Sequence, residues 1–278
     1  MRNAWLVLPL LMVLGACSSS RSWSRRYPPL LVPRLESPPV IDGNLSEWKY
    51  RAYHDGVWDI FRLQHSPWYN PRAELLEAQN GERRPEPDIN ARYYMAWDEK
   101  YLYLGAEVQD GANDIQDPHH APQRWYGKDA ICWFIEAPRD NTSERFGKGD
   151  NGFCFVIDAS KPAYGAWWRH GDATRTYIEE PLPPRAVDYA IRLNPWHRSP
   201  GDFILEARVE MAATLKVSNP DWRPPKPGDE YGIEIVESDP DAGDFGKHFL
   251  VYGNGDDDAT WGRMKLIGPI QPVVRRAE

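Results

Sequence analysis

Two runs of aspartates are the groups in this chain most suited to binding a metal ion. Asp239, Asp241 and Asp244 lie within six residues beside Gly243, and Asp256 begins a run of three. Carboxylate oxygens in loops are the hard ligands that calcium prefers, but neither run follows the spacing of an EF-hand loop. The aspartates are therefore either calcium ligands or parts of solvated turns.

Glutamates in strand-like runs suggest a second kind of chemistry, because a pair of carboxylates can hydrolyse a glycoside. The four such residues are Glu136, Glu206, Glu210 and Glu234. Alternation along the strands predicts that several of them lie on a solvent-facing surface. The sequence has neither a Gly-x-Ser-x-Gly elbow nor a Gly-rich phosphate loop. We therefore expect no intrinsic catalysis, and a glycoside-acting enzyme remains an alternative.

The abundance of tryptophan indicates contact with a ligand. The chain contains 13 Trp residues and 13% aromatic residues, more than a hydrophobic core usually requires. Sugars are a ligand class that stacks on exposed indoles. Trp167, Trp168 and Arg169 lie together in a loop-like region, and adjacent side chains on a strand point to opposite faces. At most one of the two indoles should reach a ligand, and we take Trp168 and Arg169 as candidate ligand-binding residues.

Short β-rich runs, separated by clusters of Gly, Pro and Asp, must position these groups. They cover residues 92–97, 101–108, 130–136, 152–157, 186–193, 203–210, 231–237, 249–252 and 264–266. Their spacing predicts an all-β fold, a single-domain antiparallel β-sandwich. Helix is expected only in short pieces at 71–79 and 212–215.

Alternation within two of these runs predicts which side chains face solvent. In 101–108, the aliphatic residues face the core, whereas Tyr103 and Glu107 face out. In 203–210, Glu206 and Arg208 face out. Both strands are expected to have one buried face and one wet face.

Two cysteines, Cys132 and Cys154, both fall inside strand-like runs. In an oxidising compartment they would form a disulfide if their strands are neighbours. Otherwise they would be buried free thiols. The sequence leaves both states open.

The first 17 residues have the pattern of an export signal. Arg2 precedes an apolar run that is too short to span a bilayer, and Leu14-Gly15-Ala16-Cys17 closes this run. The ending resembles the lipobox of bacterial lipoproteins, which implies removal of residues 1–16, lipidation of Cys17 and a location at the outer membrane or cell surface. A plain secretory signal or an uncleaved anchor is the alternative. Residues 17–35, rich in Ser, Arg and Pro, predict a flexible tether behind the lipidated cysteine.

The overall charge limits the kinds of partner. The net charge is −8, and phosphate binding requires basic surface. We therefore expect no nucleic-acid partner, and we expect membrane contact only through the lipid anchor.

Five motifs follow one another in residues 36–278, the expected domain. They are Pro39-Val40-Ile41-Asp42-Gly43-Asn44-Leu45-Ser46-Glu47-Trp48, Ala96 to Asp110, Trp125 to Glu136, Phe203 to Ala212, and Trp261-Gly262-Arg263-Met264-Lys265-Leu266. Their succession resembles the family 9 carbohydrate-binding modules and their broader DOMON-like relatives, which are β-sandwiches. In the opening motif, Asp42-Gly43-Asn44 is typical of a turn, which would leave Trp48 to pack beneath the sheet.

The resemblance implies a site in which two tryptophans clamp a terminal sugar while charged and amide side chains bind its hydroxyls. By position, Trp125 matches the first clamp residue, Asp129 the carboxylate that follows it, and Trp261 the second clamp residue. The resemblance also implies structural calcium, for which the first aspartate run offers ligands.

We therefore expect a non-catalytic protein that binds oligosaccharide or polysaccharide at the cell envelope and supports secreted glycoside hydrolases. A structural lipoprotein that binds another protein is an alternative, and a flat apolar patch in place of a cleft would favour it. A haem-binding DOMON-like domain is a further alternative, which would need an axial ligand pair such as Met with His.

Overall fold

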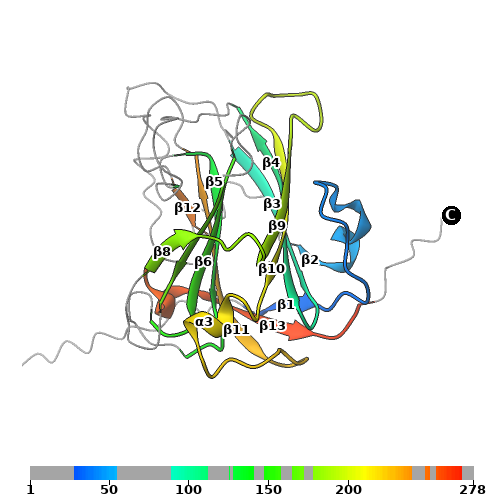
Figure 1. Ribbon diagram of the computed structural model, residues 1–278. Coiled ribbons are helices and arrows are strands. Elements are labelled where there is room, and N and C mark those ends of the chain that lie inside the picture. Colours follow the sequence, from blue (N-terminus) through cyan, green and yellow to red (C-terminus); the bar gives the residue numbers. More distant parts are fainter. Residues whose placement is uncertain are drawn as a thin grey trace, which may run out of the picture.

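Two β-sheets that face each other contain about half of the described residues (Figure 1). The computed structural model describes residues 28–54, 89–111, 125, 128–140, 147–157, 165–171, 178–239, 248–250 and 255–270. The β-sandwich prediction is confirmed, and helix is limited to short pieces among these residues. Within the same residues, no helix has the length and apolar character needed to cross a membrane.

The larger sheet has the strand order β1-β13-β11-β5-β6-β7-β8, and β12 also pairs with β11. Its strands are β1 (Leu30–Pro33), β5 (Ala130–Glu136), β6 (Asp150–Val156), β7 (Ala166–His170), β8 (Ile178–Pro181), β11 (Glu230–Ser238), β12 (His248–Leu250) and β13 (Gly262–Ile267). Strands β1 and β13 run parallel, whereas the other pairings in this sheet are antiparallel.

The smaller sheet is antiparallel throughout and has the order β2-β3-β4-β10-β9. Its strands are β2 (Tyr53–His54), β3 (Ile89–Trp97), β4 (Tyr101–Asp110), β9 (Val187–Leu193) and β10 (Phe203–Glu210). The short helical pieces are η2 (Leu45–Glu47), η3 (Lys49–Arg51), α3 (Leu215–Ser218) and η7 (Asp258–Thr260). The helix expected at 212–215 thus begins only at its last residue, and the one expected at 71–79 lies outside the described residues.

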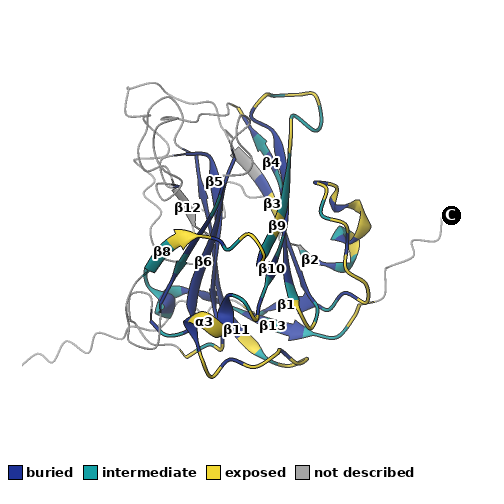
Figure 2. Cartoon of the chain, viewed as in Figure 1, coloured by how far each residue is buried: buried dark blue, intermediate teal, exposed yellow. Residues whose placement is uncertain are grey.

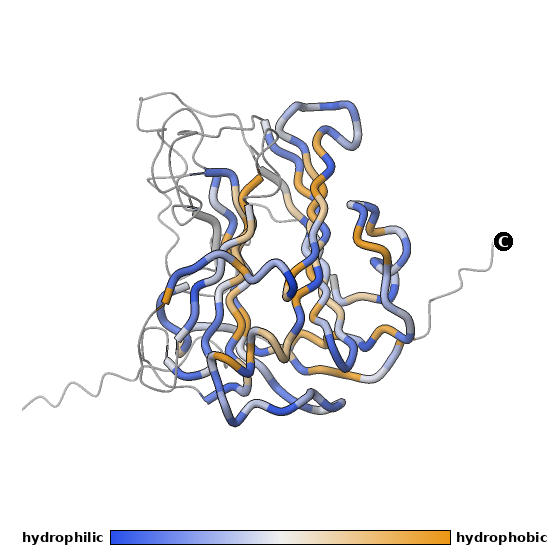
Figure 3. Tube along the Cα trace, in the orientation of Figure 1, coloured by the Kyte–Doolittle hydropathy of each residue, from blue (hydrophilic) through white to orange (hydrophobic). Residues whose placement is uncertain are grey.

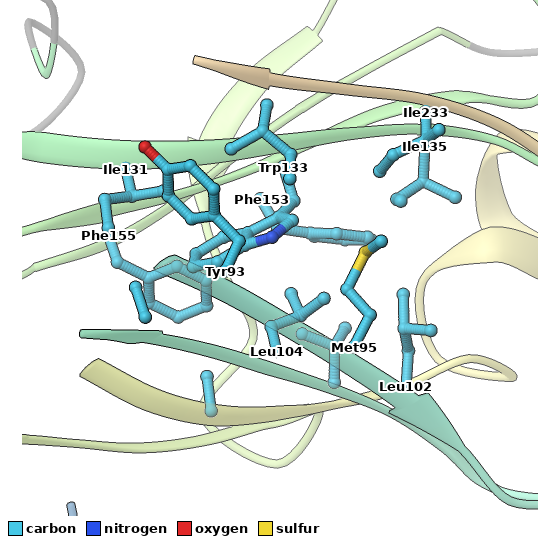
Figure 4. Packing of buried hydrophobic residues seen from close by; sticks show 14 of the residues in the cluster. Tyr93, Met95, Leu102, Leu104, Ile131, Trp133, Ile135, Phe153, Phe155 and Ile233 are labelled. Carbon is cyan, nitrogen blue, oxygen red and sulfur yellow. The ribbon is translucent and has the colours of Figure 1, made fainter. Parts of the chain in front are cut away.

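The core lies between the sheets. Tyr93, Met95 and Leu104 of the smaller sheet face Trp133 and Phe155 of the larger sheet (Figure 4). The edge of the Trp133 ring packs on Phe155, with ring centroids 5.9 Å apart. Buried residues dominate the inner strands of both sheets, whereas the edge strands β8 and β9 have none (Figure 2). Hydrophobic segments run through both sheets (Figure 3). Burial of these side chains is the main source of stability in such a fold.

The N-terminal part of the described chain belongs to the fold, which corrects the prediction of a flexible tether through residue 35. Strand β1 pairs with β13, and Leu35 donates its backbone N–H to the Trp97 carbonyl at 2.8 Å. The Trp97 Nε1–H lies 3.1 Å from the carbonyl oxygens of both Val32 and Ile267. Strand β3 is thereby tied to β1 and β13 across the two sheets. The Pro-rich sequence at 28–33 gave no strand signal, because proline is rare in the interior of a sheet. It is tolerated here because β1 is a short strand at the edge of its sheet.

The opening motif covers the outer face of the smaller sheet (Figure 1). The Glu206 carboxylate accepts hydrogen bonds from the backbone N–H of Asp42 at 2.9 Å, from that of Gly43 at 2.8 Å and from Trp48 Nε1 at 2.7 Å. Glu206 and Tyr103 are both fully buried beneath this cover. The prediction that these two side chains face solvent is therefore wrong, because alternation reports the face of a sheet but not what packs on it.

Cys132 and Cys154 form a disulfide. They are directly paired in the β5–β6 register, with their Cα atoms 4.0 Å apart. The disulfide lies on the outer face of the larger sheet. Of the two states left open by the sequence, the structure has the cross-linked one.

Candidate functional site

A second hydrophobic cluster covers the outer face of the larger sheet, and we call it the outer aromatic cluster. It consists of Trp125, Ala130, Cys132, Phe134, Cys154, Val156, Trp167, Val236 and Trp261. Alternation along β5 creates it, because Trp133 points into the core and its neighbour Phe134 points outward. The disulfide forms part of its floor.

Phe134 connects the two tryptophans that the family resemblance singled out. Its ring centroid lies 6.3 Å from that of Trp125 and 5.6 Å from that of Trp261. Trp125 is 3% exposed and Trp261 is 1% exposed. The structure therefore brings the two predicted clamp residues into one cluster, but neither indole presents an open face to solvent.

Charged side chains form a rim at one side of this cluster, which we call the charged rim: Arg169, Glu179 and Asp256. The Arg169 guanidinium carbon lies 5.8 Å from the centroid of the Trp125 ring. Its Nε donates to Glu179 Oε1 at 2.6 Å, and its Nη1 lies 3.8 Å from Asp256 Oδ1. The three side chains are 12%, 27% and 39% exposed in that order. A ligand at the rim would meet both hydrogen-bond donors and acceptors next to an aromatic surface.

Trp168 lies on the other face of β7, in the core between the sheets. It is 1% exposed, its Nε1 donates to Asn151 Oδ1 at 3.1 Å, and its ring stacks on His170 at 3.8 Å. The predicted ligand contact of Trp168 is therefore corrected to a core role. The expectation that adjacent tryptophans point apart is met, but Trp167 is the one in the outer aromatic cluster.

Asp129 joins a different group of side chains, although it is only four residues from Trp125. It belongs to a group of three buried carboxylates with Asp110, at the end of β4, and Asp239, directly after β11. One oxygen of each residue lies within 4.8 Å of the others. Hard oxygen donors at this spacing fit calcium chemistry. Asp239 was a predicted ligand, whereas its predicted partners Asp241 and Asp244 lie outside the described residues.

A further acidic group joins the outer face of β5 to the segment before β13. It consists of Glu136, Asp140 and Asp258, again with oxygens within 4.8 Å of one another. Glu136 is fully buried, and this burial raises the pKa of its carboxyl to about 9, with Asp150 and Asp258 adding to the rise. The Asp140 backbone N–H donates to Glu136 and opposes the shift.

Sequence reasoning missed three residues that the structure places in these groups. Glu179 reaches Arg169 only because β8 pairs with β7 in a register that no local pattern shows. Asp110 ends a recognisable strand, but its proximity to Asp129 depends on how the two sheets face each other. Phe134 lies in the run 130–136, which is apolar apart from Glu136, so no alternation in the sequence marks its side chain as outward-facing.

Comparison with known proteins agrees with this architecture. The family model described as carbohydrate family 9 binding domain-like matches residues 64–269. Two solved structures of a family 9 carbohydrate-binding module from Caldicellulosiruptor kristjanssonii are similar in fold. The one in complex with cellotriose has a TM-score of 0.56 and 15% identity, over 90% of this chain and 100% of that chain. The one in complex with glucose has a TM-score of 0.54 and 14% identity, over 88% and 99%.

No curated protein sequence matches this chain. The family model nevertheless spans most of the chain, and the two sheets agree with the fold of the solved modules. On this evidence the chain belongs to the carbohydrate family 9 binding domain-like family.

Proposed function

We propose that this protein binds carbohydrate and does not act on it chemically. Membership of the family 9 binding domains is the observation that carries the proposal. It is supported by the two solved modules of similar fold, one in complex with cellotriose and the other with glucose.

The charged rim is the part of the described surface best suited to such a ligand. Sugar hydroxyls need paired donors and acceptors, and the apolar face of a pyranose packs on an aromatic ring. Arg169 supplies donors, Glu179 and Asp256 supply acceptors, and Trp125 lies directly beneath the guanidinium. Because both predicted clamp indoles are buried, we place ligand contact at the charged rim.

The burial of the strand glutamates supports a non-catalytic role. Glu136, Glu206 and Glu234 are each fully buried, and Glu206 is engaged by the opening motif. A general acid or nucleophile must contact its substrate. Of the four glutamates considered from the sequence, Glu210 is the one with appreciable exposure, and its side chain lies 3.8 Å from Lys100 Nζ.

The setting of this binding is part of the proposal. A lipid anchor at Cys17 would hold the domain at the outer membrane or cell surface, where it would present polysaccharide to secreted glycoside hydrolases. The export pattern of residues 1–17 supports this location. Labelling with a radioactive fatty acid, lost in Cys17→Ala, tests the anchor.

We also propose a structural calcium ion held by Asp110, Asp129 and Asp239. Because these residues come from both sheets, the ion would stabilise the sandwich. The test is thermal unfolding with calcium and with chelator: the melting temperature should fall on chelation in the native protein and remain unchanged in Asp239→Asn.

Isothermal titration of the protein against a panel of oligosaccharides tests the main proposal. Arg169→Ala and Trp125→Ala should each weaken saturable binding. Arg208→Ala is the matched control, because Arg208 pairs with Asp188 on the smaller sheet at 3.0 Å and is not part of the rim. Absence of binding across a broad panel would refute carbohydrate binding, and binding unaffected by both Arg169→Ala and Trp125→Ala would refute its location.

A further inference from the structure

Edge strand β8 lies next to the proposed ligand contact. It is the last strand of the larger sheet in the described chain, paired on one side with β7. Arg169 of β7 is directly opposite Glu179 of β8 in this register. Directly opposed residues on one face have side chains within reach of each other, so the backbone pairing itself aims Glu179 at the arginine.

The contact between the two side chains is close and partly shielded from solvent. Glu179 Oε1 accepts from Arg169 Nε at 2.6 Å, and the side chains are 27% and 12% exposed. An arginine side chain has many rotamers, and holding it in one of them costs conformational entropy. A charge-assisted bond of this kind selects one orientation of the guanidinium.

The orientation that Glu179 selects is the one suited to ligand contact. Glu179 accepts from the Nε side of the guanidinium. The Nη side carries four of the five N–H donors and is turned toward Asp256, whose Oδ1 lies 3.8 Å from Nη1. The same placement puts the guanidinium over Trp125. The guanidinium is thereby held beside the aromatic surface before any ligand arrives.

The opposite face of β8 is also fastened to β7. His170 Nε2 lies 3.2 Å from Glu180 Oε1, and the buried His170 ring stacks on Trp168. The strand is therefore held on both of its faces, which fixes the backbone position from which Glu179 reaches Arg169.

We infer that Glu179 is a positioning residue for the ligand: it holds Arg169 in the orientation that binds sugar hydroxyls and does not itself need to touch the sugar. The inference rests on the proposed carbohydrate binding. Its mechanism is preorganisation, in which the protein carries the ordering cost before the ligand arrives.

The experiment uses the whole protein and the variants Glu179→Gln, Arg169→Ala and their double variant. Glu179→Gln should weaken oligosaccharide binding about tenfold, and the same change should alter affinity less than about twofold when Arg169 is already alanine, because coupled residues are not additive. The matched control is Asp188→Asn, which removes the carboxylate partner of Arg208 on the other sheet, and it should leave affinity unchanged.

A spectroscopic measurement separates positioning from general stability. The Nε–Hε NMR signal of Arg169, identified by its loss in Arg169→Ala, should move toward the free-arginine position in Glu179→Gln and stay in place in Asp188→Asn. Any one of three results would overturn the inference. Glu179→Gln could bind as tightly as the native protein, the two substitutions could have additive effects in the double variant, or the Nε signal could stay in place in Glu179→Gln. Failure of the native protein to bind any sugar would instead refute the proposed function, while the NMR signal would still test the orienting contact.

Discussion

Removal of the charge on Glu206 is expected to lower the free energy of unfolding, because this carboxylate binds the opening motif to the smaller sheet. The buried carboxylate accepts three hydrogen bonds, two from backbone N–H groups on one oxygen and one from the Trp48 indole on the other. Glutamine at this position keeps one acceptor oxygen and replaces the other with an N–H₂ group. One of the three donors then faces another donor, in a region with no access to water.

The expected cost of Glu206→Gln follows from these contacts. Loss of one bond with its donor left buried costs about 1–3 kcal/mol, and the two remaining bonds weaken from charged to neutral, by about 1 kcal/mol each. A buried amide is cheaper to desolvate than a buried carboxylate, which offsets part of this loss. We expect a net decrease of about 3 kcal/mol in the free energy of unfolding.

Urea unfolding at pH 7, followed by tryptophan fluorescence, measures this change, provided that the slope of the transition is unchanged. Glu210→Gln is the control, because Glu210 lies four residues along the same strand and its side chain is 25% exposed. Glu210→Gln should lower the free energy of unfolding by less than about 0.5 kcal/mol. The reasoning is refuted if Glu206→Gln costs less than about 1 kcal/mol, or if its cost is the same in a Trp48→Phe background, where the indole donor is absent.

Three further perturbations test other parts of the fold. Because the pKa of Glu136 is raised to about 9, the folded protein keeps a proton between pH 4.5 and 9 that the unfolded chain has lost. The free energy of unfolding should therefore fall as pH rises through this window. The melting temperature of Glu136→Gln should depend less on pH across the same range. Replacing Cys132 and Cys154 with alanine opens a cross-link with a sequence separation of 22 and should lower the unfolding free energy by about 3 kcal/mol in urea; no change would mean that the thiols are not linked in solution. Gly43 has a φ of +80°, and an added Cβ would lie 3.1 Å from Arg192 Cγ, so Gly43→Ala should cost about 1–2 kcal/mol; an unchanged melting temperature would contradict this strain.

Strand positions could be read from the sequence where one face meets the core. The runs at 130–136 and 203–210 coincide with β5 and β10, and the run at 231–237 falls one residue inside each end of β11. These strands were identifiable as β-rich runs bounded by clusters of Gly, Pro and Asp. Strands β1, β2, β7 and β8 were missed, since each is short and depends on a neighbour for its pairing.

The candidate site was predictable in part for the same reason. Trp125 and Trp261 were matched by motif order, and the structure places them around Phe134. The error for Trp168 came from choosing the face of a strand whose register was unknown. Asp129 was assigned to the sugar because of its short distance from Trp125 in the sequence, whereas the fold of the two sheets sends its carboxylate toward Asp110 and Asp239.

The parallel pairing of β1 with β13 determines how the domain would bear mechanical load. Four successive residue pairs, from Leu30 with Met264 to Pro33 with Ile267, lie in one register. A pull on the chain ahead of residue 30, directed along the strand, would shear this ladder as a unit, whereas a pull across the strand would open it one pair at a time. Resistance to force should therefore depend on the direction of pulling and be greatest along the strand.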